Sequence, residues 1–288
     1  MPAARARTSA AGRVVRWCVA VLALLTAGIG TLGRSVAGGG APSPARPAEV
    51  DTALIVSIDV SNSVDEHRYK LQIEGIAAAL EDPSVIDAIL NGPQGGILFS
   101  LVTWADRPKI ALPWMRIASR ADSLAVAQAI RGMPRHDGEF TCLGQMLRYI
   151  SDKVVPQIPA KALRVIIDVS GDGRDNCNSE EPIGHVRDEL VASGVTINGL
   201  PILEGREAAT LAPWYRDNVM GGPGAFVLPA DGFEDFGRAI RQKFVIEISN
   251  AHGPEPTRSG SLAESAIEVL GRVEADRLVL ALEADQPR

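Results

Sequence analysis

The stretch "IVSIDVSNSVDE", residues 55–66, decides how the rest of the chain is interpreted. It starts inside a continuous apolar run, 52–58, which is typical of a strand buried on both faces of a parallel sheet. Directly after this run come Asp59, Ser61 and Ser63. Because side chains two residues apart in an extended segment point the same way, the three oxygen-bearing side chains are predicted to converge at the strand's end.

Strand-like and helix-like segments alternate along the chain. The apolar runs predict strands at 52–58, 96–104, 109–114, 163–170, 194–202 and 225–229. Helical spacing predicts helices at 65–80, 119–133, 141–154, 181–193, 207–219 and 233–248. This alternation predicts an α/β fold with a doubly wound, mostly parallel sheet, helices on both faces, and one short antiparallel edge strand. Sheets of this kind bind ligands at the carboxyl ends of their strands.

Two further loops carry short oxygen side chains. Thr141 lies at the predicted start of a helix in "HDGEFTCLG", residues 136–144, and Asp172 follows a buried strand in "VSGDGRDN", residues 169–176. With the first loop they make an all-oxygen set, which selects hard cations such as Mg²⁺, Mn²⁺ or Ca²⁺. Only two carboxylates neutralise the cation, so Mg²⁺ could keep a coordination position for an outside carboxylate.

Each of these residues alone has a simpler explanation. Ser63 and Glu66 form the capping-box pattern S-x-x-E, which would account for Ser63 without a metal. Thr141 could cap its helix, and Asp172 could make an Asx turn. The cation cradle is favoured by the set of three loops that should meet at one sheet edge. From the spacing alone both interpretations stay open.

The same residues resemble the von Willebrand factor type A (vWA) domain, whose metal-ion-dependent adhesion site (MIDAS) begins with D-x-S-x-S. Asp59, Ser61 and Ser63 match that motif, Thr141 matches the family's later Thr, and Asp172 matches its last Asp. The resemblance covers about residues 50–250, includes "LVTWADRPKIAL" as the second strand and hairpin, and is greatest to the uncharacterised exported bacterial members. It implies a Rossmann-like fold, hydroxyl ligands to Mg²⁺, carboxylates bound directly or through water, and a ligand carboxylate in the open position.

The sequence departs from the family pattern in two places. Gly171 stands where the family usually has Thr, and "GEF" stands before Thr141 where Gly-Gly is commoner. Neither departure removes a ligand. We therefore expect a non-enzymatic, metal-dependent module that binds a protein ligand through an acidic side chain. The alternatives are a Mg²⁺-dependent hydrolase, with Asp59 or Asp172 as base or nucleophile, and a structural domain whose metal only pins loops.

The N-terminal residues predict export. Residues 1–16 carry four arginines and no acid, an uncharged apolar run follows, and small residues precede Ala37. This is typical of a signal peptide, 1–37, cleaved near Ala37 into the periplasm or medium; the alternative is a retained membrane anchor. We expect a Gly/Pro-rich linker at 38–49, the folded domain at 50–250, and an extension of uncertain structure at 251–288.

The charge balance excludes one class of partner. Cleavage would remove five of the 29 basic residues and none of the 35 acidic ones, which leaves a net charge of −11. An acidic protein of this kind lacks the clustered Lys and Arg that nucleic-acid phosphates require. Contact with a membrane is expected only through an uncleaved N-terminal segment.

Two cysteines remain after cleavage, Cys142 and Cys177. In an oxidising compartment they predict a disulfide, and the alternative is two separate thiols. Because Cys142 follows Thr141 and Cys177 lies shortly after Asp172, the alignment with the vWA site favours a bridge between the two loops. Two further carboxylates are weaker candidates. Asp168 could support the metal from behind or pair with an arginine, and Asp175 could be a second supporting residue.

Overall fold

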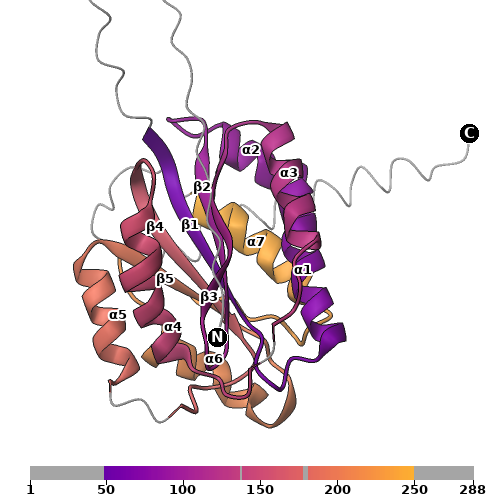
Figure 1. Cartoon of the computed structure of the whole chain (residues 1–288), viewed down its shortest axis with the longest axis vertical. Coiled ribbons are helices and arrows are strands. Elements are labelled where there is room, and N and C mark those ends of the chain that lie inside the picture. Colours follow the sequence, from indigo (N-terminus) through magenta and orange to yellow (C-terminus); the bar gives the residue numbers. More distant parts are fainter. Residues whose placement is uncertain (1–48, 137, 178–180, 250–288) are drawn as a thin grey trace, which may run out of the picture. The chain divides into compact units, whose positions relative to one another are not determined.

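The computed structural model describes residues 49–136, 138–177 and 181–249 (Figure 1). The predicted signal peptide, nearly all of the predicted linker, and the extension at 251–288 lie outside the described residues. The first strand of the described part begins at Glu49.

One sheet of five strands forms the centre of the domain. The order across the sheet is β3-β2-β1-β4-β5. The pairs β1–β2, β1–β4 and β4–β5 are parallel, and β2–β3 is antiparallel, as the sequence predicts. The strands are β1 (Glu49–Asp59), β2 (Ile97–Trp104), β3 (Lys109–Ile117), β4 (Lys161–Gly171) and β5 (Val195–Pro201).

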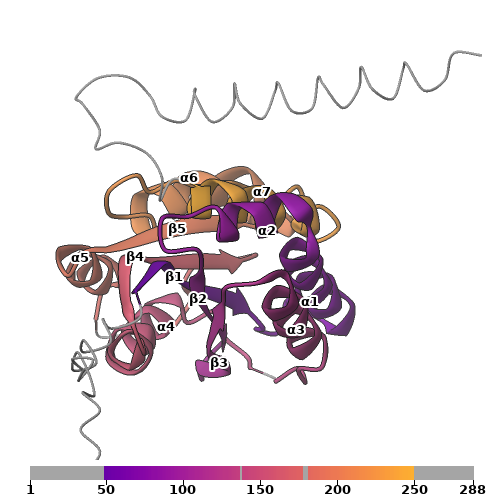
Figure 2. The ribbon, with the colours of Figure 1, turned by 90° about the horizontal axis from the view of Figure 1, so that it is seen from above.

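Helices cover both faces of the sheet (Figure 2). Helices α1, α2, α3 and α7 pack on one face, and α4 and α5 pack on the other, with α6 beside β5. Their bounds are α1 (Glu66–Glu81), α2 (Pro83–Leu90), α3 (Arg120–Arg131), α4 (Leu143–Tyr149), α5 (Ile183–Ala192), α6 (Ala208–Asn218) and α7 (Phe236–Ser249). This arrangement is the predicted doubly wound α/β architecture.

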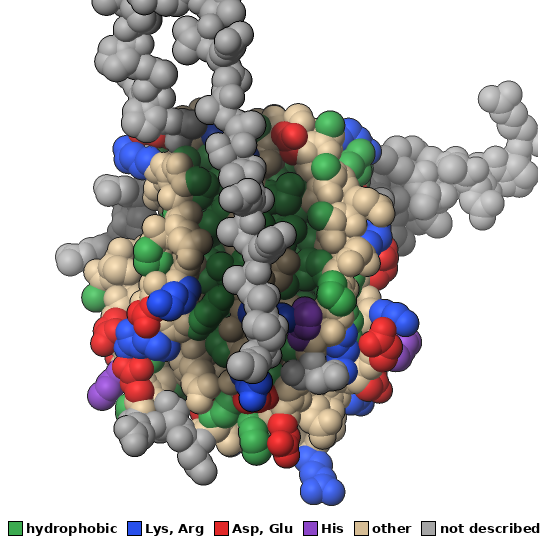
Figure 3. All heavy atoms as spheres, in the orientation of Figure 1, with side chains coloured by type: hydrophobic (Ala, Val, Ile, Leu, Met, Phe, Trp, Pro, Cys, Tyr) green, Lys and Arg blue, Asp and Glu red, His purple; other side chains and the backbone are tan. Residues whose placement is uncertain are grey.

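The alternation of β1 explains the two cores. Leu54, Val56 and Ile58 point into the core under α1 and α7, whereas Ile55 points into the core under α4 and α5. Figure 3 shows the face of the domain on which β1, β2 and β3 lie in Figure 1; hydrophobic side chains gather along its middle and charged side chains lie mainly around its rim. Burial on both faces explains the unbroken apolar runs of β1 and β2.

Three sequence-based predictions of secondary structure need correction. The predicted strand at 225–229 forms only isolated bridges to the β5 region. The predicted helix at 141–154 is α4 followed by a π-helical turn, Ile150–Val154. Helix α2 was not predicted. It begins after Asp82, whose carboxylate accepts the Ser84 backbone N–H, and Pro83 lies in its first turn. Proline is well suited to that position because its missing N–H would have no helical partner there.

Candidate functional site

Three loops bring the predicted oxygen side chains together at the carboxyl ends of the parallel strands. Thr141 Oγ1 lies 3.4 Å from Ser61 Oγ, and Ser61 Oγ lies 3.3 Å from Ser63 Oγ. Ser63 Oγ donates a 2.8 Å hydrogen bond to Asp172 Oδ1. Three loops far apart in the sequence therefore form one continuous row of oxygens, in which the bonded pair Ser63 and Asp172 is 109 positions apart.

Asp59 lies at the end of β1 and is completely buried. Its Oδ1 accepts a 2.7 Å hydrogen bond from the Ser61 backbone N–H, whereas its Oδ2 has no hydrogen-bond partner among the described residues. Burial, and then the neighbouring charge of Asp172, raise the pKa of Asp59 to about 7. An ionised Asp59 therefore lacks a compensating positive charge at this position.

Ser63 faces the site instead of capping a helix. The N-cap of α1 is Asp65, whose side chain accepts the Arg68 backbone N–H at 2.8 Å, so the capping-box interpretation of Ser63 and Glu66 is wrong. Asp65 is nearer to the first helical residue and accepts the same kind of bond, which leaves the exposed Ser63 hydroxyl for Asp172. Burial raises the pKa of Asp172, and the bond from Ser63 opposes that rise.

The loop that carries Thr141 is tied to the loop after β4. The Thr141 backbone N–H donates to Asn176 Oδ1 at 2.8 Å, and the Asn176 backbone N–H donates to the Thr141 carbonyl at 3.0 Å. This role of Asn176 was not predicted, because the local sequence does not indicate a hydrogen-bond partner 35 residues away. Thr141 itself caps no helix, because the N-cap residue of α4 is Cys142, which makes no side-chain capping bond. Its hydroxyl is directed toward Ser61 instead.

A disulfide joins the same two loops, as predicted. Cys142 and Cys177 are bonded, with their Cα atoms 5.1 Å apart. Beside the bridge, Asp175 Oδ1 accepts the Gly144 backbone N–H at 3.0 Å in the first turn of α4. Asp175 thus supports the loop of Thr141 and makes no hydrogen bond to the row of oxygens among the described contacts.

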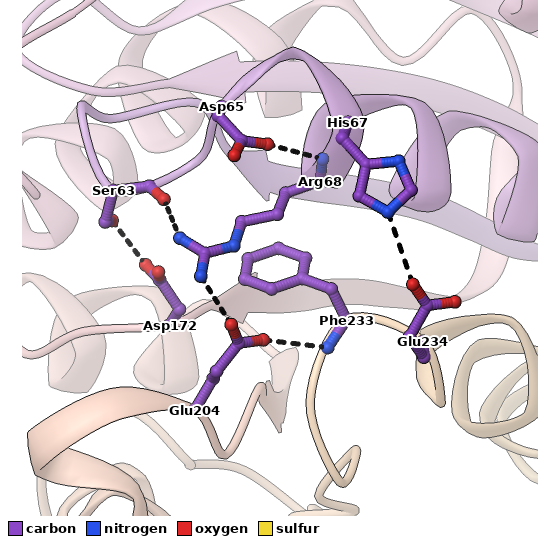
Figure 4. A network of polar contacts seen from close by, with 8 residues as sticks. All are labelled: Ser63, Asp65, His67, Arg68, Asp172, Glu204, Phe233 and Glu234. Atoms are coloured by element: carbon purple, nitrogen blue, oxygen red, sulfur yellow. Dashed lines mark hydrogen bonds and ion pairs between the residues drawn. The ribbon is translucent and has the colours of Figure 1, made fainter.

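Arg68 connects three segments beside the site (Figure 4). Its guanidinium donates to the Ser63 carbonyl at 2.6 Å, pairs with Glu204 after β5, and lies over the Phe233 ring, 5.3 Å from its centroid. Glu204 also accepts the Phe233 backbone N–H at 3.3 Å. Arg68 is therefore engaged in holding loops together, although its charge reaches Asp172.

Asp168 pairs with a lysine, where the sequence analysis expected an arginine or a supporting role at the metal. Lys243 Nζ of α7 lies 3.0 Å from Asp168 Oδ1, and both side chains are completely buried. Glu247 also pairs with Lys243, and its Oε1 accepts a 2.7 Å hydrogen bond from Asn198. The cluster joins α7 to β4 and β5, and none of the residues in the oxygen row hydrogen-bonds to it.

The oxygen row fits a hard cation. Among the described residues no three His, Cys, Asp or Glu side chains gather to hold a metal, so a cation here would depend on hydroxyl ligands. The hydroxyl separations of 3.3–3.4 Å are longer than a good O–H···O bond, and Asp59 has a buried oxygen without a partner. Hydroxyls that bond poorly to one another, together with a buried carboxylate oxygen that has no partner, are a suitable donor set for Mg²⁺ or a similar ion.

The row is open to solvent on one side. Asn62 and Ser63 are exposed, whereas Ser61 and Thr141 are buried beneath them. A shallow hollow of about 450 Å³ lies beside Asn62, lined also by Asp106, Arg107, Gly138 and Glu139. A ligand could therefore reach the row from outside. Within the described part of the chain, no helix has the length and hydropathy of a membrane span.

Comparisons with known proteins agree with this architecture. The family model described as "Protein of unknown function (DUF1194)" matches residues 49–252. No curated protein matches the chain. Among solved structures, proximal thread matrix protein 1 from the mussel byssus aligns with a TM-score of 0.53 and 18% identity over 70% of this chain and 48% of its own.

Two other solved structures have the same fold. The mussel protein with a zinc-occupied MIDAS motif aligns with a TM-score of 0.50 and 21% identity, over 70% of this chain and 49% of its own. The von Willebrand factor type A structure from Catenulispora acidiphila aligns with a TM-score of 0.50 and 16% identity, over 72% and 44%. The chain spans less than half the length of these proteins. The predicted vWA-type fold is confirmed.

Proposed function

The chain belongs to the family described as "Protein of unknown function (DUF1194)", and from that premise we propose that it is an exported, metal-dependent protein-binding module. The observation that carries the proposal is the row of hydroxyl and carboxylate oxygens at the end of a vWA-type sheet. The open side of this row takes an acidic side chain of a protein ligand. One solved structure of the same fold is described as having a zinc-occupied MIDAS motif, which supports a divalent cation at such a sheet edge.

The cation is held by residues from all three loops. Ser61, Ser63 and Thr141 supply hydroxyl oxygens, and Asp59 and Asp172 supply carboxylates directly or through water. Mg²⁺ is the preferred ion because the donor set is all oxygen and carries only two negative charges; Mn²⁺ and Ca²⁺ are the alternatives. When bound, the cation supplies a positive charge that attracts a ligand carboxylate.

Binding fits the surroundings of the row better than hydrolysis does. A hydrolase would need a positive side chain free to act on the substrate beside the metal. Arg68, whose charge reaches Asp172, is already engaged by Glu204 and the Ser63 carbonyl. Arg107, which lines the hollow beside Asn62, lies 3.9 Å from Asp106 and is 94% exposed on the surface, so it does not form a clamp inside a deep pocket. The exposed Asn62 and Ser63 at the rim suit a ligand that approaches from another protein's surface.

Export is supported by two observations besides the predicted signal peptide. The Cys142–Cys177 disulfide suits an oxidising compartment, where such bridges persist. One solved structure of the same fold comes from the mussel byssus, a material outside the cell. We propose cleavage near Ala37 and release to the periplasm or medium.

A calorimetric titration tests the metal site. Mg²⁺ and Mn²⁺ are titrated into the purified protein, its Asp59→Asn variant, and a Ser100→Ala control that removes a buried hydroxyl bonded to the Leu112 carbonyl. The proposal requires saturable binding by the wild type and the control and none by Asp59→Asn. Equal or absent heats in all three proteins would rule out the metal site.

A second titration tests the open position. The Mn²⁺-loaded protein is mixed with a short peptide that has a single central Glu, or with the same peptide carrying Gln, and water-proton relaxation is followed. A carboxylate that replaces a Mn²⁺-bound water lowers the relaxation enhancement, so only the Glu peptide should have an effect. The same small response to both peptides would show that no carboxylate enters the coordination sphere.

A further inference from the structure

Gly171, at the end of β4, leaves a space that two polar groups share. A Cβ atom at this position would lie 2.9 Å from the Tyr215 hydroxyl oxygen and 3.0 Å from Asp59 Oδ2. Any side chain here would therefore be forced between the two groups. The absence of one allows the Tyr215 hydroxyl and the Asp59 carboxylate to face the same point.

Tyr215 comes from α6 and is completely buried behind the oxygen row. Its hydroxyl donates to the Gly171 carbonyl at 3.4 Å, a long bond that is easily exchanged for a better one. A phenol hydroxyl is a hydrogen-bond donor at neutral pH, so Tyr215 places a donor close to a carboxylate.

Asp59 supplies an acceptor for this donor. Its Oδ1 is fixed by the Ser61 backbone N–H at 2.7 Å, but its buried Oδ2 has no partner among the described residues. A carboxylate has roughly four lone-pair positions on its two oxygens. One donor on each oxygen would fix the plane of the group and still leave lone pairs for a cation or its bound water.

We propose that Tyr215 is a positioning residue of the metal site: when the cation binds, its hydroxyl leaves the Gly171 carbonyl, donates to Asp59 Oδ2 and orients the ionised carboxylate toward the cation. The inference rests on the proposed metal site and extends it to α6. A donor behind a ligating carboxylate fixes its direction and stabilises its charge, and removal of such a partner typically weakens metal binding by roughly 10- to 100-fold.

Tyr69 offers a matched control. It is also a buried tyrosine, 3% exposed, and its hydroxyl donates to a backbone carbonyl, that of Met133, at 3.3 Å. Loss of either hydroxyl removes one oxygen from a packed interior without changing the ring. Only Tyr215 lies beside Asp59, so only its hydroxyl should affect the cation.

The experiment measures Mg²⁺ and Mn²⁺ affinity by calorimetry for the wild type, Tyr215→Phe and Tyr69→Phe. We expect Tyr215→Phe to bind both ions roughly 10- to 100-fold more weakly and Tyr69→Phe to bind like the wild type. Denaturant unfolding of the metal-free proteins shows whether both variants fold. Equal affinities of the two variants would overturn the role of Tyr215 and leave the metal site intact, whereas no binding by the wild type would overturn both proposals.

A spectroscopic measurement separates positioning from packing. If the Tyr215 hydroxyl changes partner when the cation binds, Mg²⁺ should produce a near-ultraviolet tyrosine difference spectrum in the wild type and in Tyr69→Phe but not in Tyr215→Phe. A residue that only fills space would give no such signal. The same difference spectrum in all three proteins would contradict the proposal.

Discussion

Asp59 and Asp168 make an instructive pair, because two similar buried carboxylates lie in contrasting surroundings. Each lies on a strand of the same sheet and is completely buried, and burial is the main cause that raises the pKa of each. Asp168 has the Lys243 ammonium 3.0 Å away. Asp59 has only neutral donors, from the backbone and side chain of Ser61, and the charge of Asp172 raises its pKa further.

The difference separates structural from functional burial of charge. The Asp168 cluster contains its own cation and joins α7 to the sheet through Lys243, Glu247 and Asn198. The Asp59 site has two acids and no lysine or arginine bonded to either carboxylate among the described contacts. A buried charge is tolerated only when it is compensated, and the proposed cation would compensate Asp59 as Lys243 compensates Asp168.

The largest effect should come from breaking the internal pair. Lys243→Met leaves Asp168 and Glu247 buried without their cation, and we expect the free energy of unfolding to fall by about 3–5 kcal/mol. Urea unfolding measures the loss. Lys70→Met, which removes an exposed pair with Glu66, is the control and should change stability by less than about 1 kcal/mol. Similar small losses in both variants would show that the buried cluster stabilises no more than a surface pair.

Removal of the Cys142–Cys177 disulfide tests what holds the loops of the proposed metal site together. Replacement of Cys142 and Cys177 by serine should lower the free energy of unfolding by roughly 3–4 kcal/mol, because the bridge closes a loop with a sequence separation of 35. Cation affinity should fall as well, since Thr141 is adjacent to the bridge. Urea unfolding and calorimetry measure the two effects. Unchanged cation affinity would mean that Asn176 and Asp175 align the loops without the disulfide.

Asp59→Asn should raise the free energy of unfolding, whereas Lys243→Met should lower it. The folded-state pKa of Asp59 is raised by burial to about 7, well above that of an exposed aspartate, so the metal-free protein loses stability as pH rises from about 4 through 7. The neutral Asn avoids this loss and still accepts the Ser61 N–H. Because a pKa rise from about 4 to about 7 corresponds to about 4 kcal/mol, stability at pH 8 should rise by up to about 4 kcal/mol. Unfolding in the presence of a chelator measures the gain. A clear loss of stability would show that Asp59 is already compensated within the protein.

The sequence could predict those parts of the site that follow from local spacing and sheet topology. Asp59 ends β1, and parallel strands bring the loops of Thr141 and Asp172 to the same edge. Ser61 and Ser63 follow in a turn, and not in the predicted extended segment. The central strands of the sheet were predictable because strands buried on both faces are continuous apolar runs. The sixth predicted strand, 225–229, was wrong, since it forms only isolated bridges.

The partners were not predictable, since they depend on side chains that meet across long separations. Asp168 meets Lys243 from α7, and Gly171 meets Tyr215 from α6; neither pair leaves a local pattern. Ser63 shows a second limit of sequence-based prediction, because Ser63 and Asp65 are both suited to cap α1. Asp65 takes the helix cap, and only the folded chain shows which of them wins.

The smallest effect, a pH dependence, tests the contrast between the two carboxylates without altering the metal site. Protons compete with the cation for Asp59, whose pKa is about 7, so Mg²⁺ should bind roughly tenfold more weakly at pH 6 than at pH 8. Protonation of Asp168 should not matter, because Lys243 neutralises it away from the oxygen row. The Asp168→Asn variant should therefore keep the tenfold dependence in calorimetric titrations at the two pH values. If the dependence disappears in that variant, the two carboxylates are coupled, and the internal cluster cannot be treated as separate from the metal site.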